Sequence, residues 1–421
     1  MAWTGWIGVI GGIATVAAAI EEDLRGRLPA QHKKQRAGLA LLAATMLDVR
    51  SANLMDLAAS LPRAAERLDM RYQWISRLLG NPRIGVEAVM APHVREILAR
   101  LAADGRRVVL MIDQAQASER HQVVMVAARI GGRALPLAWR VKATQGAIGL
   151  AEQRAVLATV AGLLPAGVRP VLMGDRFYGT PDLIAWCRGH GWDWRLRLKQ
   201  DLLVFQEGGE TSLAACWAAG ERLLWDVELT AKRVATHIAM VHEPSHPEPW
   251  IIALSEAPSV HRAFDYGLRW GIEAMLADFK TRGFGLEDSH LERPDRMARL
   301  ILVMALALFW AVSTGMWDIV HRATPDEKSP GRAASQPAAR PDLVLQAWHP
   351  SPSDVPAAPD TTATAVECLA ELMGGKGSSQ PQGAGATLRR RRSAPGNRRR
   401  SVQGPGRGEW WAASRGSGGH G

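Results

Sequence analysis

The chain has 421 residues, of which 47 % are hydrophobic and 22 % charged, a balance typical of a soluble globular protein with two or three domains. Its formal net charge of +10 favours an anionic partner. Residues 389–421 contain nine arginines and one glutamate, however, so this stretch carries +8 and leaves only +2 for the other residues. Any surface for nucleic acid in the folded part must therefore come from local patches.

Three cysteines, Cys187, Cys216 and Cys368, lie far apart and form no CxxC or Cys/His metal-binding pattern. Neither a disulfide framework nor a zinc module is indicated, and a cytoplasmic location is expected. Leu300–Trp317 is an uncharged stretch of 18 residues, which is long enough to cross a membrane. Because it is rich in alanine and ends in Ser-Thr-Gly, we interpret it as a buried core helix and expect no membrane association.

Residues 1–24 are an uncertain apolar N-terminal extension, which lacks the basic segment of a signal peptide. Residues 25–100 are predicted to form short helices, because apolar side chains recur there at helical spacing, with Ser51 or Asn53 as an N-cap. Five arginines are interleaved with this pattern: Arg63, Arg67, Arg71, Arg77 and Arg83. They belong either to a DNA-binding domain with a helix-turn-helix-like pair or to the solvated face of a helical packing domain.

From Arg107 onward the pattern changes to strands. Val108–Ile112 is a continuous apolar run that ends at Asp113, and Gly131-Gly132 is typical of a hairpin turn. Further strands are predicted at 122–129, 134–141, 171–173 and 192–198, and helices at 150–164 and 181–188. A β-rich insertion at 200–257 precedes the last core helices. This order predicts an α/β fold over residues 101–322, with a ribonuclease H-like mixed sheet flanked by helices.

Residues 323–421 consist largely of Pro, Ala, Ser, Gly and Arg, with two arginine clusters at 389–392 and 398–400. Such a composition cannot bury enough apolar surface to fold, so it predicts a disordered basic tail. The tail could bind DNA non-specifically, or it could have no function.

Two of the predicted strands end in an aspartate, Asp113 and Asp175. Ligand sites of α/β proteins form at strand ends, although an aspartate there is often only a turn residue. The segment Phe264–Lys280 carries more information. If it is one helix, with about 100° per residue, four polar side chains fall in a stripe roughly 60° wide. These are Tyr266, Arg269, Glu273 and Lys280.

Beside this stripe, the predicted helix has an apolar stripe that can face the core; it consists of Leu268, Ile272, Met275 and Phe279. An ordinary surface helix with an i,i+4 ion pair would explain Arg269 and Glu273. It would not explain why Tyr266 and Lys280 share their line. The spacing therefore favours a carboxylate presented between cations and a phenol.

The pattern Tyr-x2-Arg-x3-Glu-x6-Lys resembles the YREK signature of a large group of DDE insertion-sequence transposases, and this chain has every position of it. The contexts of the aspartates, VVLMIDQ (108–114) and GDRFYGTPDLIAWCRGHGWDWRLRLK (174–199), are also similar to that group, as is EPWIIALSEAP (248–258). The resemblance covers roughly residues 36–317. The chain departs from the group after about residue 322, where further helical structure would help to pair protomers.

The resemblance implies a cut-and-paste transposase in which Asp113, Asp175 and Glu273 hold two Mg²⁺ or Mn²⁺ ions. Hard cations prefer carboxylate oxygens, and two ions can clamp the entering and leaving oxygens of a phosphodiester. Asp113 would bridge the ions, while the other two acids would each hold one. Cleavage at the element's end would free a 3′-hydroxyl, which would form and reopen a hairpin before it attacks target DNA.

The same resemblance implies that Tyr266, Arg269 and Lys280 contact DNA phosphates. Trp250 matches a position where an indole stacks on a flipped base, although it could also be an ordinary core residue at a strand start. The expected partners are inverted-repeat ends and target DNA, bound by a homodimer. Two alternatives stay open: a ribonuclease H-like nuclease without strand transfer, and an inactive transposase remnant that binds DNA as a regulator.

Overall fold

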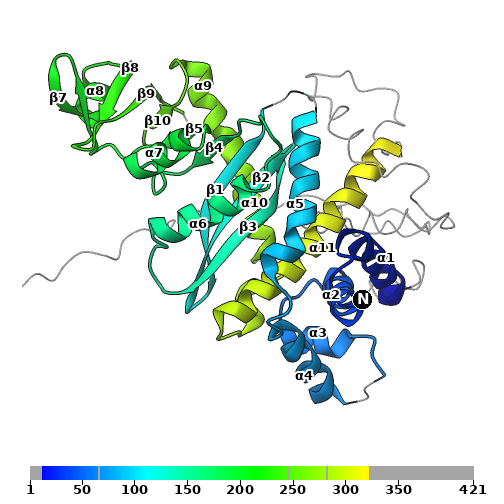
Figure 1. The fold of residues 1–421 in the computed structure, drawn as a ribbon. Coiled ribbons are helices and arrows are strands. Elements are labelled where there is room, and N and C mark those ends of the chain that lie inside the picture. The colour runs from blue at the N-terminus through cyan, green and yellow to red at the C-terminus, as the bar shows by residue number, and fades with distance from the viewer. Residues whose placement is uncertain are drawn as a thin grey trace, which may run out of the picture. The chain divides into compact units, whose positions relative to one another are not determined.

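Ten strands form one mixed sheet in the order β3-β2-β1-β4-β5-β10-β9-β8-β6-β7 (Figure 1). The computed structural model describes residues 12–64, 67–103, 105, 107–243, 246–280 and 283–321, with side chains up to residue 314. All of these lie in one compact unit. Residues 12–24 of the uncertain N-terminal extension are described, whereas the predicted tail at 323–421 lies outside the described residues.

The first five strands form the core of the sheet: β1 (Val109–Ser118), β2 (His121–Ile130), β3 (Arg133–Ala143), β4 (Val171–Gly174) and β5 (Asp193–Arg197). Strands β1, β4 and β5 run parallel, and β2 and β3 continue the sheet antiparallel through the hairpin at Gly131. Gly131 has a φ of 56°, which a tight turn requires and glycine adopts at little cost. The predicted ribonuclease H-like α/β fold is confirmed.

The β-rich insertion continues this same sheet. It contributes β6 (Leu203–Gln206), β7 (Gly209–Ser212), β8 (Leu223–Leu229), β9 (Val234–Val241) and β10 (Trp250–Leu254), together with helix α8 (Leu213–Ala218). Strand β10 is buried throughout and pairs antiparallel with β5, so it joins the insertion to the core. The sequence predicted the β content of this segment but not its attachment, because register between distant strands is decided by packing.

Among the described residues, five helices precede the sheet: α1 (Gly12–Arg27), α2 (Lys33–Val49), α3 (Leu54–Ser60), α4 (Leu68–Leu79) and α5 (Val86–Ala103). The N-terminal extension includes most of α1, which buries Ile20 and Leu24 and packs on α2. Asn53 caps α3 by accepting a hydrogen bond from the amide of Met55. Ser51, the other candidate cap, donates to Asp56 instead.

Helices cover the core strands on both sides: α6 (Leu150–Ala161) contacts β2 and β3, and α7 (Pro181–Gly189) contacts β5. The chain then forms α9 (Val260–Phe264), the 3-10 turn η1 (Asp265–Arg269), α10 (Trp270–Phe279), the 3-10 turn η2 (Leu286–Ser289) and α11 (Pro294–His321). Helices α10 and α11 both contact β3, and Figure 1 shows α6 and α5 at opposite sides of these strands.

The prediction of one continuous helix over Phe264–Lys280 is wrong. The segment is divided into the end of α9, η1 and α10, and Lys280 caps α10 with non-helical dihedral angles (φ −90°, ψ −120°). In this arrangement Tyr266 lies in the apolar cluster with Trp250, and Arg269 donates to Asp113 of β1. Ile272, Met275 and Phe279 are buried, as the apolar stripe predicts.

Helix α11 begins before the uncharged stretch noted in the sequence and contains it. Within the described part of the chain it is one helix long and apolar enough to cross a membrane, but most of its apolar window is buried inside the protein. Its residues Leu300–Leu308 are almost completely covered. The helix therefore has the burial of a core helix, and its length and composition alone are weak evidence for a membrane span.

Candidate active site

Asp113 and Asp175 lie next to each other because of the register of two parallel strands. Ile112 of β1 is paired with Gly174 of β4, and the next residue after each of them is an aspartate. Paired positions of neighbouring strands point to the same face of a sheet, which brings the two carboxylates together. One detail of the prediction is wrong: β1 does not end at Asp113 but continues to Ser118, because β2 pairs with it along its whole length.

The turn after β4 is packed too closely for other residues at two glycine positions. A Cβ at Gly174 would lie 2.7 Å from the Cβ of Tyr178, and one at Gly179 would lie 1.9 Å from the carbonyl oxygen of Arg197. Asp175 stabilises the turn, since its Oδ1 accepts a hydrogen bond from the amide of Phe177 at 2.9 Å. The turn therefore holds Asp175 at the end of β4 and brings Tyr178 under it.

Glu273 reaches the aspartates through Arg269. The guanidinium of Arg269 donates from Nη1 to Asp113 Oδ2 at 3.1 Å and from Nη2 to Glu273 Oε1. Its side chain is 9 % exposed, whereas that of Glu273 is 52 % exposed. Helix α10 can approach β3 because a Cβ at Gly271 would already lie 3.2 Å from the carbonyl oxygen of Arg133. One buried cation therefore bridges acids from β1 and α10.

The groups around Asp113 perturb its carboxyl electrostatically. Burial raises the pKa of Asp113 to about 6, Arg269 opposes the shift, and Asp175 and Glu273 add to it. Burial alone would lower the pKa of Arg269, but Tyr266, Asp113, Glu273 and Asp175 together raise it. Asp175, Glu273 and the Arg269 guanidinium thus all act on the carboxyl of Asp113. A carboxylate whose pKa is raised by burial and by like charges is a common property of functional sites.

Tyr178 is a member of this cluster that the sequence did not single out. Its ring is 1 % exposed, and its hydroxyl is buried without a hydrogen-bond partner among the described residues. Burial raises the pKa of Tyr178 well above its usual value, and Asp113 and Asp175 raise it further, so the phenol stays neutral. A buried hydroxyl without a hydrogen-bond partner costs free energy of folding, unless a group bound in the site accepts its hydrogen bond.

The predicted metal ligands fit divalent cations in type but do not form a closed cage. Within the described residues, no three acidic, histidine or cysteine side chains are close enough to hold an ion together. Asp113 and Glu273 instead each give an oxygen to Arg269. Asp113 and Glu273 are therefore already paired with a cationic side chain. Their carboxylate oxygens are the ligand type that Mg²⁺ and Mn²⁺ prefer.

Two of the predicted DNA-contact residues, Trp250 and Lys280, make contacts within the protein itself. Trp250 is 2 % exposed and makes edge-to-face contacts with Tyr266 at 5.3 Å and with Trp270 at 5.5 Å between ring centroids. Lys280 pairs with Glu287 at 2.8 Å. Trp270, which the sequence analysis did not consider, is 41 % exposed and stacks on His246. Trp250 thus sits as a core residue at a strand start, one of its two interpretations.

The arginines of the helical region are partly engaged in local contacts. Arg63 lies over the ring of Trp74 at 4.5 Å, Arg67 pairs with Asp69 at 2.8 Å, and Arg71 donates to the carbonyl of Ala59. The ion pair between Arg67 and Asp69 is well exposed and therefore weak, so it would compete only weakly with a phosphate for Arg67. Both a DNA-binding role and a packing role remain compatible with these contacts.

Residues 149–310 of the chain match a family model described as the transposase DDE domain. The match supports a transposase of the DDE type. DDE transposases are metal-dependent enzymes that transfer phosphoryl groups of DNA. The matched stretch contains Asp175, Arg269 and Glu273, whereas Asp113 precedes it. A search of curated proteins gave no match.

Proposed function

We propose that this chain is a cut-and-paste DNA transposase of the YREK-signature group, with Asp113, Asp175 and Glu273 as its metal ligands and catalytic acids. The observation that supports the proposal best is the shared electrostatic environment of the three carboxylates, drawn from β1, β4 and α10, around Arg269. Arg269 bonds one oxygen of Asp113 and one of Glu273. A single guanidinium thus faces three acidic side chains, and the proposal assigns cations to the excess negative charge.

Two Mg²⁺ or Mn²⁺ ions would supply the activation of water and the stabilisation of the charge that develops on the phosphate. In this proposal Asp113, which adjoins Asp175 and is bonded to Arg269, would hold both ions. Asp175 and Glu273 would hold one each. The neutral hydroxyl of Tyr178 can donate a hydrogen bond to an anionic group in the site.

When DNA binds, Arg269 is proposed to leave Asp113 and Glu273 and to bond a DNA phosphate instead. As long as Arg269 bonds Asp113 and Glu273, these oxygens are occupied. A guanidinium matches phosphate as well as carboxylate, so DNA offers it an alternative partner. Transfer of Arg269 to a phosphate would leave the acids free for cations. Tyr266 and Lys280 are further proposed phosphate contacts, and Trp250 a proposed base contact if its cluster opens.

The test is cleavage by the purified full-length protein of supercoiled plasmid DNA, with Mg²⁺ or Mn²⁺. Asp113→Asn and Glu273→Gln should each lower the rate by about a thousandfold or more, because each removes a charged metal ligand. Asp278→Asn is the matched control: Asp278 is also acidic and ion-paired and lies on α10 like Glu273, but its partner is Arg133. If Asp113→Asn cleaves as fast as the wild type, the site assignment is wrong.

Strand transfer separates the transposase from a nuclease. DNA that ends in the element's inverted repeat with a free 3′-hydroxyl should become joined to a target plasmid, whereas a nuclease would only cut. We further propose a cytoplasmic protein without membrane association, which acts as a homodimer on two DNA ends. Molecular mass measured with and without end DNA tests the assembly.

A further inference from the structure

The turn η1 carries Tyr266 and Arg269 and joins α9 directly to α10. A 3-10 turn has poorer hydrogen-bond geometry than an α-helix, so contacts from other elements contribute to its position. Tyr266 is held from one side by the apolar cluster around Trp250. Asp265, the first residue of η1, is held from the other side by Arg195, whose Nη1 lies 2.8 Å from Asp265 Oδ2.

Arg195 is an unusual residue for the middle of a sheet. It lies on β5, its side chain is 7 % exposed, and its register partners are Met173 of β4 and Leu254 of β10. Burial lowers the pKa of Arg195, and among its neighbours Asp265 opposes that shift most strongly. The buried charge of Arg195 is thus compensated mainly by the residue that begins η1.

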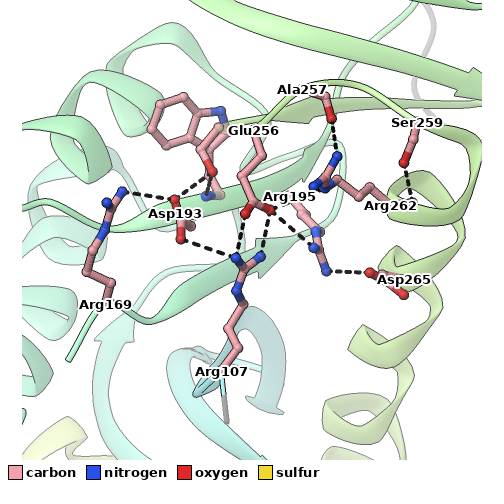
Figure 2. Close-up of polar contacts among 11 residues, drawn as sticks. Arg107, Arg169, Asp193, Arg195, Glu256, Ala257, Ser259, Arg262 and Asp265 are labelled. Carbon is pink, nitrogen blue, oxygen red and sulfur yellow. Dashed lines mark hydrogen bonds and ion pairs between the residues drawn. The ribbon is translucent and has the colours of Figure 1, made fainter. Parts of the chain in front are cut away.

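A larger ion network fixes Arg195 from its other end (Figure 2). Arg195 Nη2 lies 3.5 Å from Glu256 Oε2, and Glu256 accepts two hydrogen bonds from Arg107, at 2.7 and 2.5 Å. Arg262 also approaches Glu256, at 3.5 Å. The hydrogen bonds of Arg107 lower the pKa of Glu256 to about 2. The anchor therefore stays ionised at any pH at which the enzyme would act.

Strand β5 also supports Asp175. Leu196, which follows Arg195, pairs with Gly174, and Gly174 directly precedes Asp175. One strand thus fixes the end of β4 through its backbone and the start of η1 through its side chain. The separation between Asp175 and Arg269 depends on both attachments.

We propose that Arg195 is a positioning residue of the candidate site: through Asp265 it fixes η1, and thereby the place of Arg269 relative to Asp113 and Asp175. Arg195 touches none of the three acids itself. The consequence for DNA cleavage rests on the proposed function, whereas the consequence for η1 does not.

Asp265→Asn tests the contact without disturbing β5, because it removes the charge at the partly exposed end of the pair. Arg169→Gln is the matched control: Arg169 pairs with Asp193 at 3.2 Å in the same network but does not reach η1. Asp265→Glu restores the carboxylate. Amide hydrogen exchange of residues 265–269 is measured on the metal-free full-length protein. Nicking of supercoiled plasmid with Mn²⁺ and the thermal midpoint are measured in parallel.

Asp265→Asn should increase exchange in η1 and slow nicking, each by about tenfold, since small misplacements of a site residue have large effects on rate. Asp265→Glu should recover part of both, and Arg169→Gln should change neither. The thermal midpoint should fall no further in Asp265→Asn than in the control. Unchanged exchange, or wild-type nicking by Asp265→Asn, would overturn the proposal. If the wild type itself does not nick, the proposed function fails, and exchange alone decides the positioning role.

Discussion

Two charged clusters lie at opposite ends of the parallel strands, and they differ in how well their charges are matched. At the beginning of β1, β4 and β5, arginines surround Asp193 and Glu256, and the pKa of Glu256 falls to about 2 (Figure 2). Toward the other end, Asp113, Asp175 and Glu273 surround the single Arg269, and the pKa of Asp113 rises to about 6. In the first cluster arginines compensate the acids, whereas in the second the acidic side chains outnumber the arginine, as the proposed metal site would require.

The largest effect should follow from removal of the central cation. Arg269→Gln leaves the acids without their buried counter-charge, and we expect a loss of about 3 kcal/mol in the free energy of unfolding at pH 7 without metal. Mn²⁺ should raise the thermal midpoint of this variant more than that of the wild type, because the acids are no longer occupied. Equal shifts in both proteins would contradict the exchange of Arg269 for cations. Arg133→Gln, which breaks a pair with Asp278, is the control.

A smaller effect of opposite sign is expected from Asp113→Asn. The folded pKa of Asp113 lies above its unfolded value of 3.8, so its ionised form costs stability; the cost begins near pH 4 and is fully present above about pH 6. The Asp113→Asn variant should therefore be more stable than the wild type at pH 7, by about 2 kcal/mol. The difference should shrink as the pH falls through 6 toward 4. Urea unfolding at several pH values measures it, and a destabilised variant at pH 7 would refute the interpretation.

The smallest effect should come from the matched cluster. Because the folded pKa of Glu256 lies below its usual value, the carboxylate stabilises the fold above about pH 4.5 and loses this contribution as the pH falls toward 2. Glu256→Gln should cost about 1 kcal/mol at pH 7, reduced by the partial exposure of the group. The gap to the wild type should narrow below pH 4.5 in thermal unfolding. Glu210→Gln, at an exposed glutamate of β7, should show no such dependence.

Local patterns in the sequence predicted most elements of the core. Val171–Met173 has no polar residue and became a fully buried strand, and the hairpin at Gly131 and the helix from Leu150 formed as expected. The failure over Phe264–Lys280 has a physical cause. A helical wheel assumes an unbroken helix, and the burial of Tyr266 beside Trp250 outweighed that regularity.

For the candidate site, the sequence determined which residue types were available: two aspartates at apolar strands, and a glutamate four residues after an arginine. Only the tertiary structure decided that Ile112 and Gly174 are in register, that Arg269 bridges β1 and α10, and that Arg195 supports η1. Backbone preferences act over a few residues and can be read locally. These strand pairings and ion pairs join residues 62 (Ile112 and Gly174) to 156 (Asp113 and Arg269) positions apart, so they depend on which surfaces the whole chain can bury together.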